Sequence, residues 1–466
     1  MGKLSGLRHL FMTLFLHNFA SFMVIPAITD VTMAALCPGR DECSLAIYIS
    51  GFQQAIIGLG SFVMMPLVGN LSDKHGRKAL LTVPITLTIF PLVRFQIVMY
   101  GLNSRGKGNM AILAYSRTRS FFYAYYILKI LTAMFCEGSV HCLSLAYVAD
   151  NVPEGRRASA FGILSGIGSC AFVCGTLSTR FLSTASTFQV STAMAMLSAV
   201  YMRVFLPDSI INDNLSTPII SEGKSDGVAN QNEEPDKKMQ VFKTMPSMED
   251  MLALLKSSLT FSQAAIVSFV SNLADVGLHA SLLFPLQYYL KARFHFNKDQ
   301  FADLMVITGV AGTISQLLLM PILAPALGEE RLLSVGLFFS SAHMIFYSIA
   351  WSFWVPYAAA MFSLFYVFSQ PCIRSIVSKQ VGPCEQGKAQ GIISGIGSFA
   401  NVASPLAFSP LTALFLSERA PFYFPGFSIM CVGFASMIAF VQSLMIRAIP
   451  PISSQRVGNC NYMETA

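Results

Sequence analysis

Long apolar stretches alternate with short polar segments along almost the whole chain. At about twenty residues each, twelve of these stretches are long enough to cross a bilayer as helices. They lie at 7–28, 46–68, 79–100, 121–148, 158–180, 188–206, 261–290, 300–325, 331–350, 354–378, 389–414 and 423–446. The pattern predicts an all-α, polytopic membrane protein with twelve transmembrane helices.

One polar segment divides the series into two groups of six helices. It is rich in Asn, Asp, Glu, Lys, Ser and Pro, a composition typical of disordered linkers. The predicted units are an N-terminal half at 1–206, a linker at 207–258, a C-terminal half at 259–447 and a tail at 448–466. Near the end of the linker, Ser247-Met-Glu-Asp resembles a helix-capping box and predicts a short surface helix.

Composition supports a membrane protein. Apolar residues make up 54% of the chain and charged residues 12%, whereas soluble proteins carry about twice that charged fraction. The chain has no G-x-x-x-x-G-K-[ST] loop for a nucleotide, so an ion gradient or the gradient of the substrate must drive any transport. No constellation indicates an enzyme, and the scattered cysteines and histidines predict no metal site and no cofactor.

A polar loop follows the second apolar stretch and reads Gly69-Asn-Leu-Ser-Asp73-Lys-His-Gly76-Arg77-Lys78. Its glycines permit tight turning and close backbone approach, and Asp73 can cap the next helix or pair with Arg77. The form G-x-L-x-D-[RK]-x-G-R-[RK] resembles the signature loop between helices two and three of the major facilitator superfamily. The resemblance implies that these residues gate the cytoplasmic side; a merely topogenic basic loop is the alternative.

A second stretch refines the resemblance. Residues 146–162, at the junction of the fourth and fifth spans, look like the matching stretch of tetracycline/proton antiporters. With the Gly69 loop, they resemble the eukaryotic tetracycline-resistance-like branch, which includes the hippocampus abundant transcript-like proteins. This branch implies a proton-coupled secondary transporter that moves a small organic solute by alternating access. The chain departs from the drug antiporters at His17 and Asn18, where they carry an acid, and at Lys129, where they carry an arginine.

The two halves also share a repeated segment. Gly162-Ile-Leu-Ser-Gly-Ile-Gly-Ser169 recurs as Gly391-Ile-Ile-Ser-Gly-Ile-Gly-Ser398 on the eleventh span. Duplicated six-helix units that hold a substrate between them at the midplane are the design of the superfamily. The small residues of both copies let helices approach closely, and we expect packing to be their role.

Ionisable residues inside predicted spans are the candidates for substrate or proton binding. Glu137 and His141 lie four residues apart on one helix face, and Asp275 and His279 repeat that spacing. An acid beside an imidazole can exchange a proton near neutral pH. Each pair could instead be a polar contact between helices. Lys129 could attract an anionic substrate or extend to the outer interface.

Other polar residues of the spans could line a cavity or form interhelical hydrogen bonds. They are Asn18, Gln53, Gln54, Asn272, Gln287, Gln316, His343, Gln370 and Arg374.

Most basic loops fall on one face, which the positive-inside rule makes cytoplasmic together with both termini. Cys37 and Cys43 then share an outer loop and could form a disulfide. Residues 94–110 are basic yet fall outside. They are either an ordinary outer loop or an insertion, because 79–93 joined to 111–115 would form a single span of about twenty residues. The expected partners are a small-molecule substrate, protons and the lipid bilayer, with no nucleic acid and a monomeric state. The membrane is either the plasma membrane or an endomembrane such as that of the vacuole.

A protein of a different class could share this pattern. A non-transporting membrane sensor or scaffold would keep the transporter fold and signal through its linker. The modest length of the linker and its lack of a recognisable domain favour the transporter.

Overall fold

The computed structural model is mainly helical in the residues that it describes. These are 2–36, 44–89, 120–136, 138–207, 248–279, 285–296, 298–415 and 420–448. Among them, eight helices are long and apolar enough to cross a membrane. They coincide with eight of the predicted spans, and helices lie at the other four. The all-α polytopic class is therefore confirmed.

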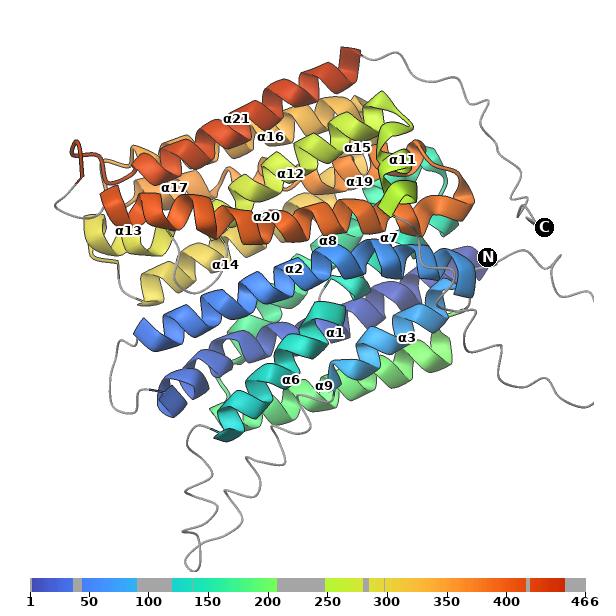
Figure 1. The fold of residues 1–466 in the computed structure, drawn as a ribbon, viewed down its shortest axis with the longest axis horizontal. Coiled ribbons are helices and arrows are strands. Elements are labelled where there is room, and N and C mark those ends of the chain that lie inside the picture. Colours follow the sequence, from blue (N-terminus) through green and yellow to red (C-terminus); the bar gives the residue numbers. More distant parts are fainter. Residues whose placement is uncertain are drawn as a thin grey trace, which may run out of the picture.

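The helices of the N-terminal half run side by side along one direction (Figure 1). They are α1 (Gly2–Leu36), α2 (Ser44–His75), α3 (Arg77–Leu87), α6 (Ser120–Cys136), α7 (Ser139–Asn151), the 3-10 turn η1 (Glu154–Arg156), α8 (Arg157–Ser178) and α9 (Thr184–Phe205). The fourth predicted span is two helices and not one. Gly138 precedes α7 at φ +86°, a left-handed conformation that only glycine adopts readily.

The C-terminal half is more interrupted. It comprises α11 (Met248–Lys256), α12 (Leu259–His279), α13 (Pro285–Phe294), α14 (Lys298–Ile314), the π-helix η3 (Ser315–Leu319), α15 (Met320–Leu327), α16 (Glu329–Ser348), α17 (Val355–Ala360), α18 (Ser363–Tyr366), α19 (Ser369–Lys379), the 3-10 turn η4 (Pro383–Glu385), α20 (Gln386–Phe415) and α21 (Phe427–Ala448). The short helix expected near the end of the linker is α11.

Three predicted spans of this half are less regular in their described residues than the apolar pattern alone indicates. The seventh comprises α12 and α13, the eighth contains η3, and the tenth divides into α17, α18 and α19. In the tenth span, hydroxyl groups compete for backbone carbonyls: Ser363 Oγ donates to Ala360 O and Ser369 Oγ donates to Tyr366 O. Such bonds disturb regular helix geometry, and the apolar pattern does not reveal them.

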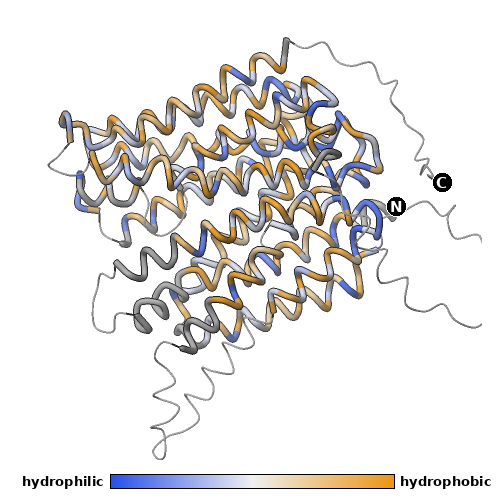
Figure 2. The backbone as a smooth tube through the Cα atoms, in the orientation of Figure 1, coloured by the Kyte–Doolittle hydropathy of each residue, from blue (hydrophilic) through white to orange (hydrophobic). Residues whose placement is uncertain are grey.

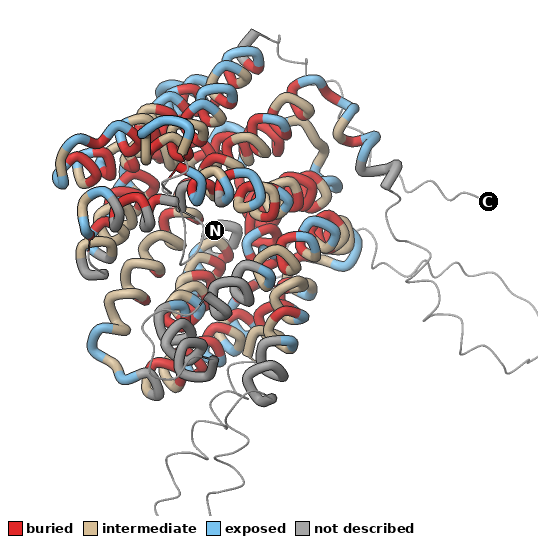
Figure 3. The backbone as a smooth tube through the Cα atoms, turned by 60° about the vertical axis from the view of Figure 1, so that its left-hand side comes forward, coloured by how far each residue is buried: buried red, intermediate tan, exposed pale blue. Residues whose placement is uncertain are grey.

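Each half has a buried apolar core, and its outer face is apolar as well. The first core includes Leu10, Leu143 and Phe161, all inaccessible. On the outside, large apolar side chains are exposed, for example Val200 at 60%. Figure 2 shows apolar colouring along most of each helix, and Figure 3 shows buried turns inside the bundle with exposed turns around it. An apolar exterior suits a hydrocarbon solvent.

The halves meet along two seams that contain the repeated segments. In the first seam, α20 packs on α2, and the two helices lie side by side in Figure 1. A Cβ added to Gly391 would lie 2.6 Å from Met65 O, so the two backbones almost touch. In the second seam, α8 packs on α14, η3 and α15. There the repeat faces side chains, since a Cβ at Gly166 would lie 2.8 Å from Leu317 Cγ.

The end of the bundle where α2 ends and α20 begins is named here the basic end. It holds the Gly69 loop, η1 and η4, and in Figure 1 it lies on the same side as the start of α1 and the end of α21. Several predictions lie outside the described residues: residues 94–110, the Cys37–Cys43 disulfide, most of the linker and the tail.

Candidate functional site

The loop at Gly69 forms a buried ionic cluster at the basic end. Arg77 contacts the carboxylate of Asp73, four residues earlier, and its Nε lies 2.8 Å from Asp150 Oδ2 at the end of α7. Arg77 also donates to Ser72 Oγ. The Arg77 and Asp73 side chains are only 5% and 6% exposed. One guanidinium therefore balances two carboxylates in a place where an unpaired charge would be costly.

The carboxylate of Asp73 reaches across to the other half. It accepts hydrogen bonds from the backbone N–H groups of Gly387, at 2.9 Å, and Lys388, at 2.8 Å. Both belong to the first turn of α20, whose N–H groups have no partners within the helix and favour a negative charge. Capping of the next helix by Asp73 was the wrong expectation, because α3 has no side-chain cap. We name this interhalf contact the Asp73 latch.

The two glycines of the loop have different geometric tasks. Gly76 precedes α3 at φ +89°, so it supplies the tight turn. Gly69 has a different constraint, because an added Cβ would overlap the carbonyl oxygen of Gly387. The absence of a side chain at Gly69 therefore allows the backbones of α2 and α20 to lie in close contact. Lys78 lies half-buried in the first turn of α3.

A second polar contact between the halves lies at the start of α8. Arg157 Nη1 donates to Ser378 O at 3.0 Å, near the end of α19. Close by, Lys379 Nζ lies 2.8 Å from Glu329 Oε2, but both residues belong to the C-terminal half. The sequence interpretation assigned no role to Asp150, Arg157, Glu329 or Lys379. The one sequence signal for Asp150 and Arg157 was that they are charged positions of the 146–162 stretch.

A polar group lies farther inside the bundle on α19 and α20. Arg374 Nη1 donates to Gln390 O at 3.0 Å, to Gln390 Oε1 at 3.4 Å and to Ser394 Oγ at 2.9 Å. His141, from α7 of the other half, lies near enough to Arg374 to interact electrostatically, and its side chain is exposed. The fold thus brings Arg374 and His141 together from opposite halves.

Asp275 lies within a polar group of the C-terminal half. From α12, its carboxyl group faces the Gln370 side chain of α19 and lies near Tyr366. The His343 ring lies 5.2 Å from the Tyr366 ring, and its Nδ1 lies 2.7 Å from Ala359 O. These residues join α12, α16 and the interrupted tenth span. The sequence placed them in the membrane but did not predict their proximity.

The remaining predicted residues are spread over several helices. Asn18 of α1 faces Gly168, and Asn272 of α12 faces the equivalent Gly397. Gln53 of α2 and Lys129 of α6 are half-buried. The predicted pairs with Glu137 and His279 stay predictions, since Glu137 and the His279 side chain lie outside the described residues.

Gln316 connects the second seam near η3. Its Oε1 accepts a hydrogen bond from Ser169 Oγ at 3.1 Å, and its Nε2 lies 3.4 Å from Val367 O. A π-helix shifts the helical register and often accompanies functional positions. Ser169 ends the first copy of the repeat, so this bond links the repeat to α17–α19.

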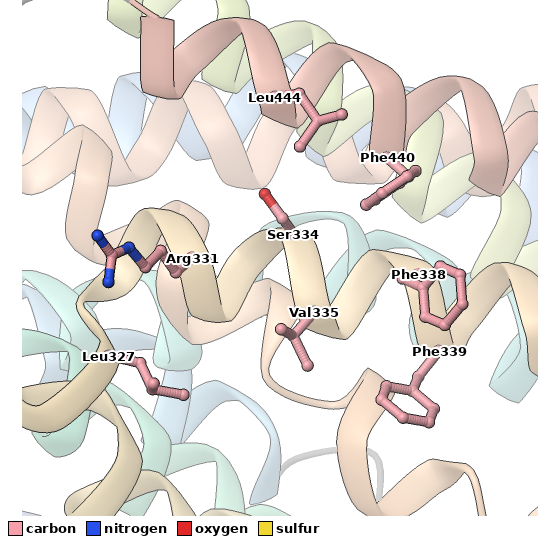
Figure 4. Close-up of a pocket in the computed structure, with 8 residues that line it drawn as sticks. All are labelled: Leu327, Arg331, Ser334, Val335, Phe338, Phe339, Phe440 and Leu444. Carbon is pink, nitrogen blue, oxygen red and sulfur yellow. The ribbon is translucent and has the colours of Figure 1, made fainter.

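A groove opens on the C-terminal half beside α16 and α21 (Figure 4). It encloses about 400 Å³ and is lined by Leu327, Arg331, Ser334, Val335, Phe338, Phe339, Phe440 and Leu444. All of these come from α15, α16 and α21, and Phe338 is 53% exposed. The groove is a surface feature, and its lining shares no residue with the polar groups described above.

Two helical halves with polar groups between them define a polytopic membrane transport protein. The family comparison agrees, because the Major Facilitator Superfamily model matches residues 10–405. The chain belongs to this superfamily.

Named relatives refine the comparison. The human hippocampus abundant transcript 1 protein is 24% identical over 416 residues, which cover 88% of this chain and 74% of that protein. The class E tetracycline resistance protein of Escherichia coli is 20% identical over 77% of this chain and 77% of its own length. The predicted resemblance to this branch is confirmed.

Solved structures share the fold. The human organic anion transporter MFSD10 superposes with a TM-score of 0.72 at 16% identity, over 95% of this chain and 100% of that one. The transporter FucP in its outward conformation superposes with a TM-score of 0.65 at 12% identity, over 96% and 99% of the two chains.

Proposed function

We propose that this protein is a secondary active transporter that moves a small organic solute by alternating access and couples the movement to protons. The observation that carries the proposal is the Asp73 latch, in which two charge-assisted hydrogen bonds join the halves at one end. Such a contact is strong enough to hold one conformation and local enough to break as a unit. The two halves then rock about the polar groups between them.

In this proposal the latch closes the cytoplasmic side. The basic end carries the loop lysines and arginines, which the positive-inside rule places in the cytoplasm together with both termini. Gly69, Asp73, Gly76, Arg77 and Lys78 act as the gate. The protein works as a monomer because each chain supplies both halves.

Asp275 is the proposed proton carrier. Its carboxyl group faces the Gln370 side chain inside the membrane region. A charged carboxylate is costly there, so a carboxyl group that takes up and releases a proton is a functional candidate by default. It also lies near Tyr366 in the tenth span, where three short helices replace a regular one. Protonation of Asp275 can therefore influence a region suited to bending. Glu137 is the second candidate, from its sequence position alone.

The test is uptake into proteoliposomes that contain the full chain. A panel of organic solutes is offered with and without an imposed pH gradient, and the protein is compared with Asp275→Asn and Glu137→Gln. Glu330→Gln is the matched control, because Glu330 is exposed at the basic end. We expect gradient-driven uptake that Asp275→Asn reduces at least tenfold and that the control retains.

The outcomes separate the parts of the proposal. Saturable uptake without any response to the gradient would remove proton coupling and keep transport. Binding of a solute with no flux, in a protein that is correctly folded, would replace the transporter with the sensor or scaffold.

A further inference from the structure

Arg374 is a cation held entirely by neutral groups. Its three hydrogen bonds, to the backbone and side chain of Gln390 and to Ser394, all use Nη1. Gln390 Nε2 returns a bond to Arg374 O at 3.1 Å, which fixes α19 against α20. The arrangement positions the guanidinium without neutralising it.

The other arginines of the interhalf region differ in this respect. Arg77 pairs with Asp73 and Asp150, and Arg157 lies 3.9 Å from Glu154. Among the residues that the structure describes, no carboxylate forms an ion pair with Arg374, and its Nε and Nη2 make no hydrogen bond. An arginine in the membrane region without a counter-ion is costly, so a function is its default explanation.

Arg374 lies near the opposite half. His141 of α7 and its neighbour Cys142 both lie within electrostatic range of Arg374. The Cys142 thiol is buried, whereas the His141 side chain is exposed. A molecule that reaches His141 can therefore also approach Arg374, and it would touch both halves at once.

We propose that Arg374 and His141 bind the carboxylate group of an organic anion, which is the transported solute. The Nε and Nη2 atoms can donate two parallel hydrogen bonds to one carboxylate, a geometry that a lysine lacks. The His141 ring supplies a further donor from the N-terminal half. This inference rests on the proposed transport function and names the class of its substrate.

The first test is ligand binding to the purified full chain in lipid nanodiscs. The probes are benzoate, glutarate and 4-aminohippurate, each compared with its neutral carboxamide, and the readout is the unfolding temperature as a function of ligand concentration. We expect stabilisation by at least one carboxylate and not by its amide. Arg374→Gln should weaken that binding at least tenfold and Arg374→Lys less, while Arg203→Gln, a change at an exposed arginine, should leave it intact.

Loss of folding in Arg374→Gln would not hide the answer. Arg374 links α19 and α20, so each variant is first compared for its elution profile and its unfolding temperature without ligand. His141→Gln leaves those bonds in place and should weaken carboxylate binding at least threefold. Equal stabilisation by acids and amides, carboxylate binding unchanged in both Arg374→Lys and His141→Gln, or no stabilisation by any carboxylate would overturn the proposal.

A transport measurement separates this inference from the function on which it rests. Proteoliposomes are offered the same acids and amides in labelled form. Uptake of the acids, dependent on Arg374, supports both proposals. Uptake of amides alone keeps the transporter and overturns the anion site, whereas carboxylate binding without any uptake keeps the site and overturns the transporter.

Discussion

The two seams between the halves use equivalent copies of one repeat but differ in what each copy touches. In the first seam, Gly391 of α20 faces the backbone of Met65, and a buried carboxylate joins α2 to the first turn of α20. In the second, Gly162 of α8 faces the side chain of Met320. Backbone contacts have little freedom to adapt, whereas a methionine can change rotamer. The difference indicates that the contacts of the first seam form or break together, whereas those of the second seam can adapt to small shifts of the helices.

The largest expected effect is that of Arg77→Gln, which leaves Asp73 and Asp150 without their cation. Breaking a buried pair costs about 3–5 kcal/mol, so the unfolding temperature should fall and the basic end should open. The matched change in the second seam, Arg157→Gln, removes bonds to Val152 O and Ser378 O and should cost less. Thermal unfolding in nanodiscs checks the order. An equal or larger loss for Arg157→Gln would contradict the comparison.

Asp73→Asn should have the next largest effect. An amide oxygen can accept only part of the hydrogen bonding of the latch and carries no charge, a loss of about 1.5–3 kcal/mol. Hydrogen exchange of peptides that cover Gln386 to Gly391 measures it directly, because the N–H groups of Gly387 and Lys388 are the donors. We expect faster exchange there, with no change in Glu330→Gln. Unaltered protection in Asp73→Asn would argue against the latch.

Alanine at the paired glycines tests the two kinds of packing. Gly391→Ala places a methyl group against the backbone of Met65 and Pro66, and overpacking of this kind costs about 1–3 kcal/mol. Gly162→Ala meets Cγ and Cβ of Met320 and no backbone atom closer than 3.6 Å, and a change of rotamer can move Cγ, so its cost should be smaller. Unfolding temperatures of the two variants give the comparison. The opposite order would mean that the second seam is the less adaptable one.

The smallest effect is expected from Glu154→Gln. Glu154 is 65% exposed and lies 3.9 Å from Arg157, so solvent already screens the pair and its loss should cost about 0–1 kcal/mol. The unfolding temperature should stay close to that of the parent protein. A clear destabilisation would show that η1 has a larger part in the second seam than its exposure indicates.

The sequence allowed the fold class to be predicted because lipid imposes a strong constraint on helix length and polarity. It also allowed the ionic pair of Asp73 and Arg77, which are near in sequence, to be anticipated. The partners of Asp73 on α20 could not be predicted, because 314 residues separate Asp73 from Gly387 and only the folded chain brings them together. The same holds for Arg374, whose polar surroundings come from α20 and α7. The interruptions of the helices could not be predicted either, because the apolar pattern carries no information about local hydrogen bonding.

The Asp73 latch constrains the residue types of the two halves unequally. The N-terminal half must supply a specific carboxylate, but the C-terminal half contributes only main-chain N–H groups. At Lys388, therefore, any residue except proline can serve, because the side chain takes no part in the contact. Gly387 is limited by space alone, since a Cβ there would collide with Arg77, Gly69 and Ser72. The chemical specificity of the latch is thus encoded in one half of the chain, while the other half needs only a helix that begins at the right place.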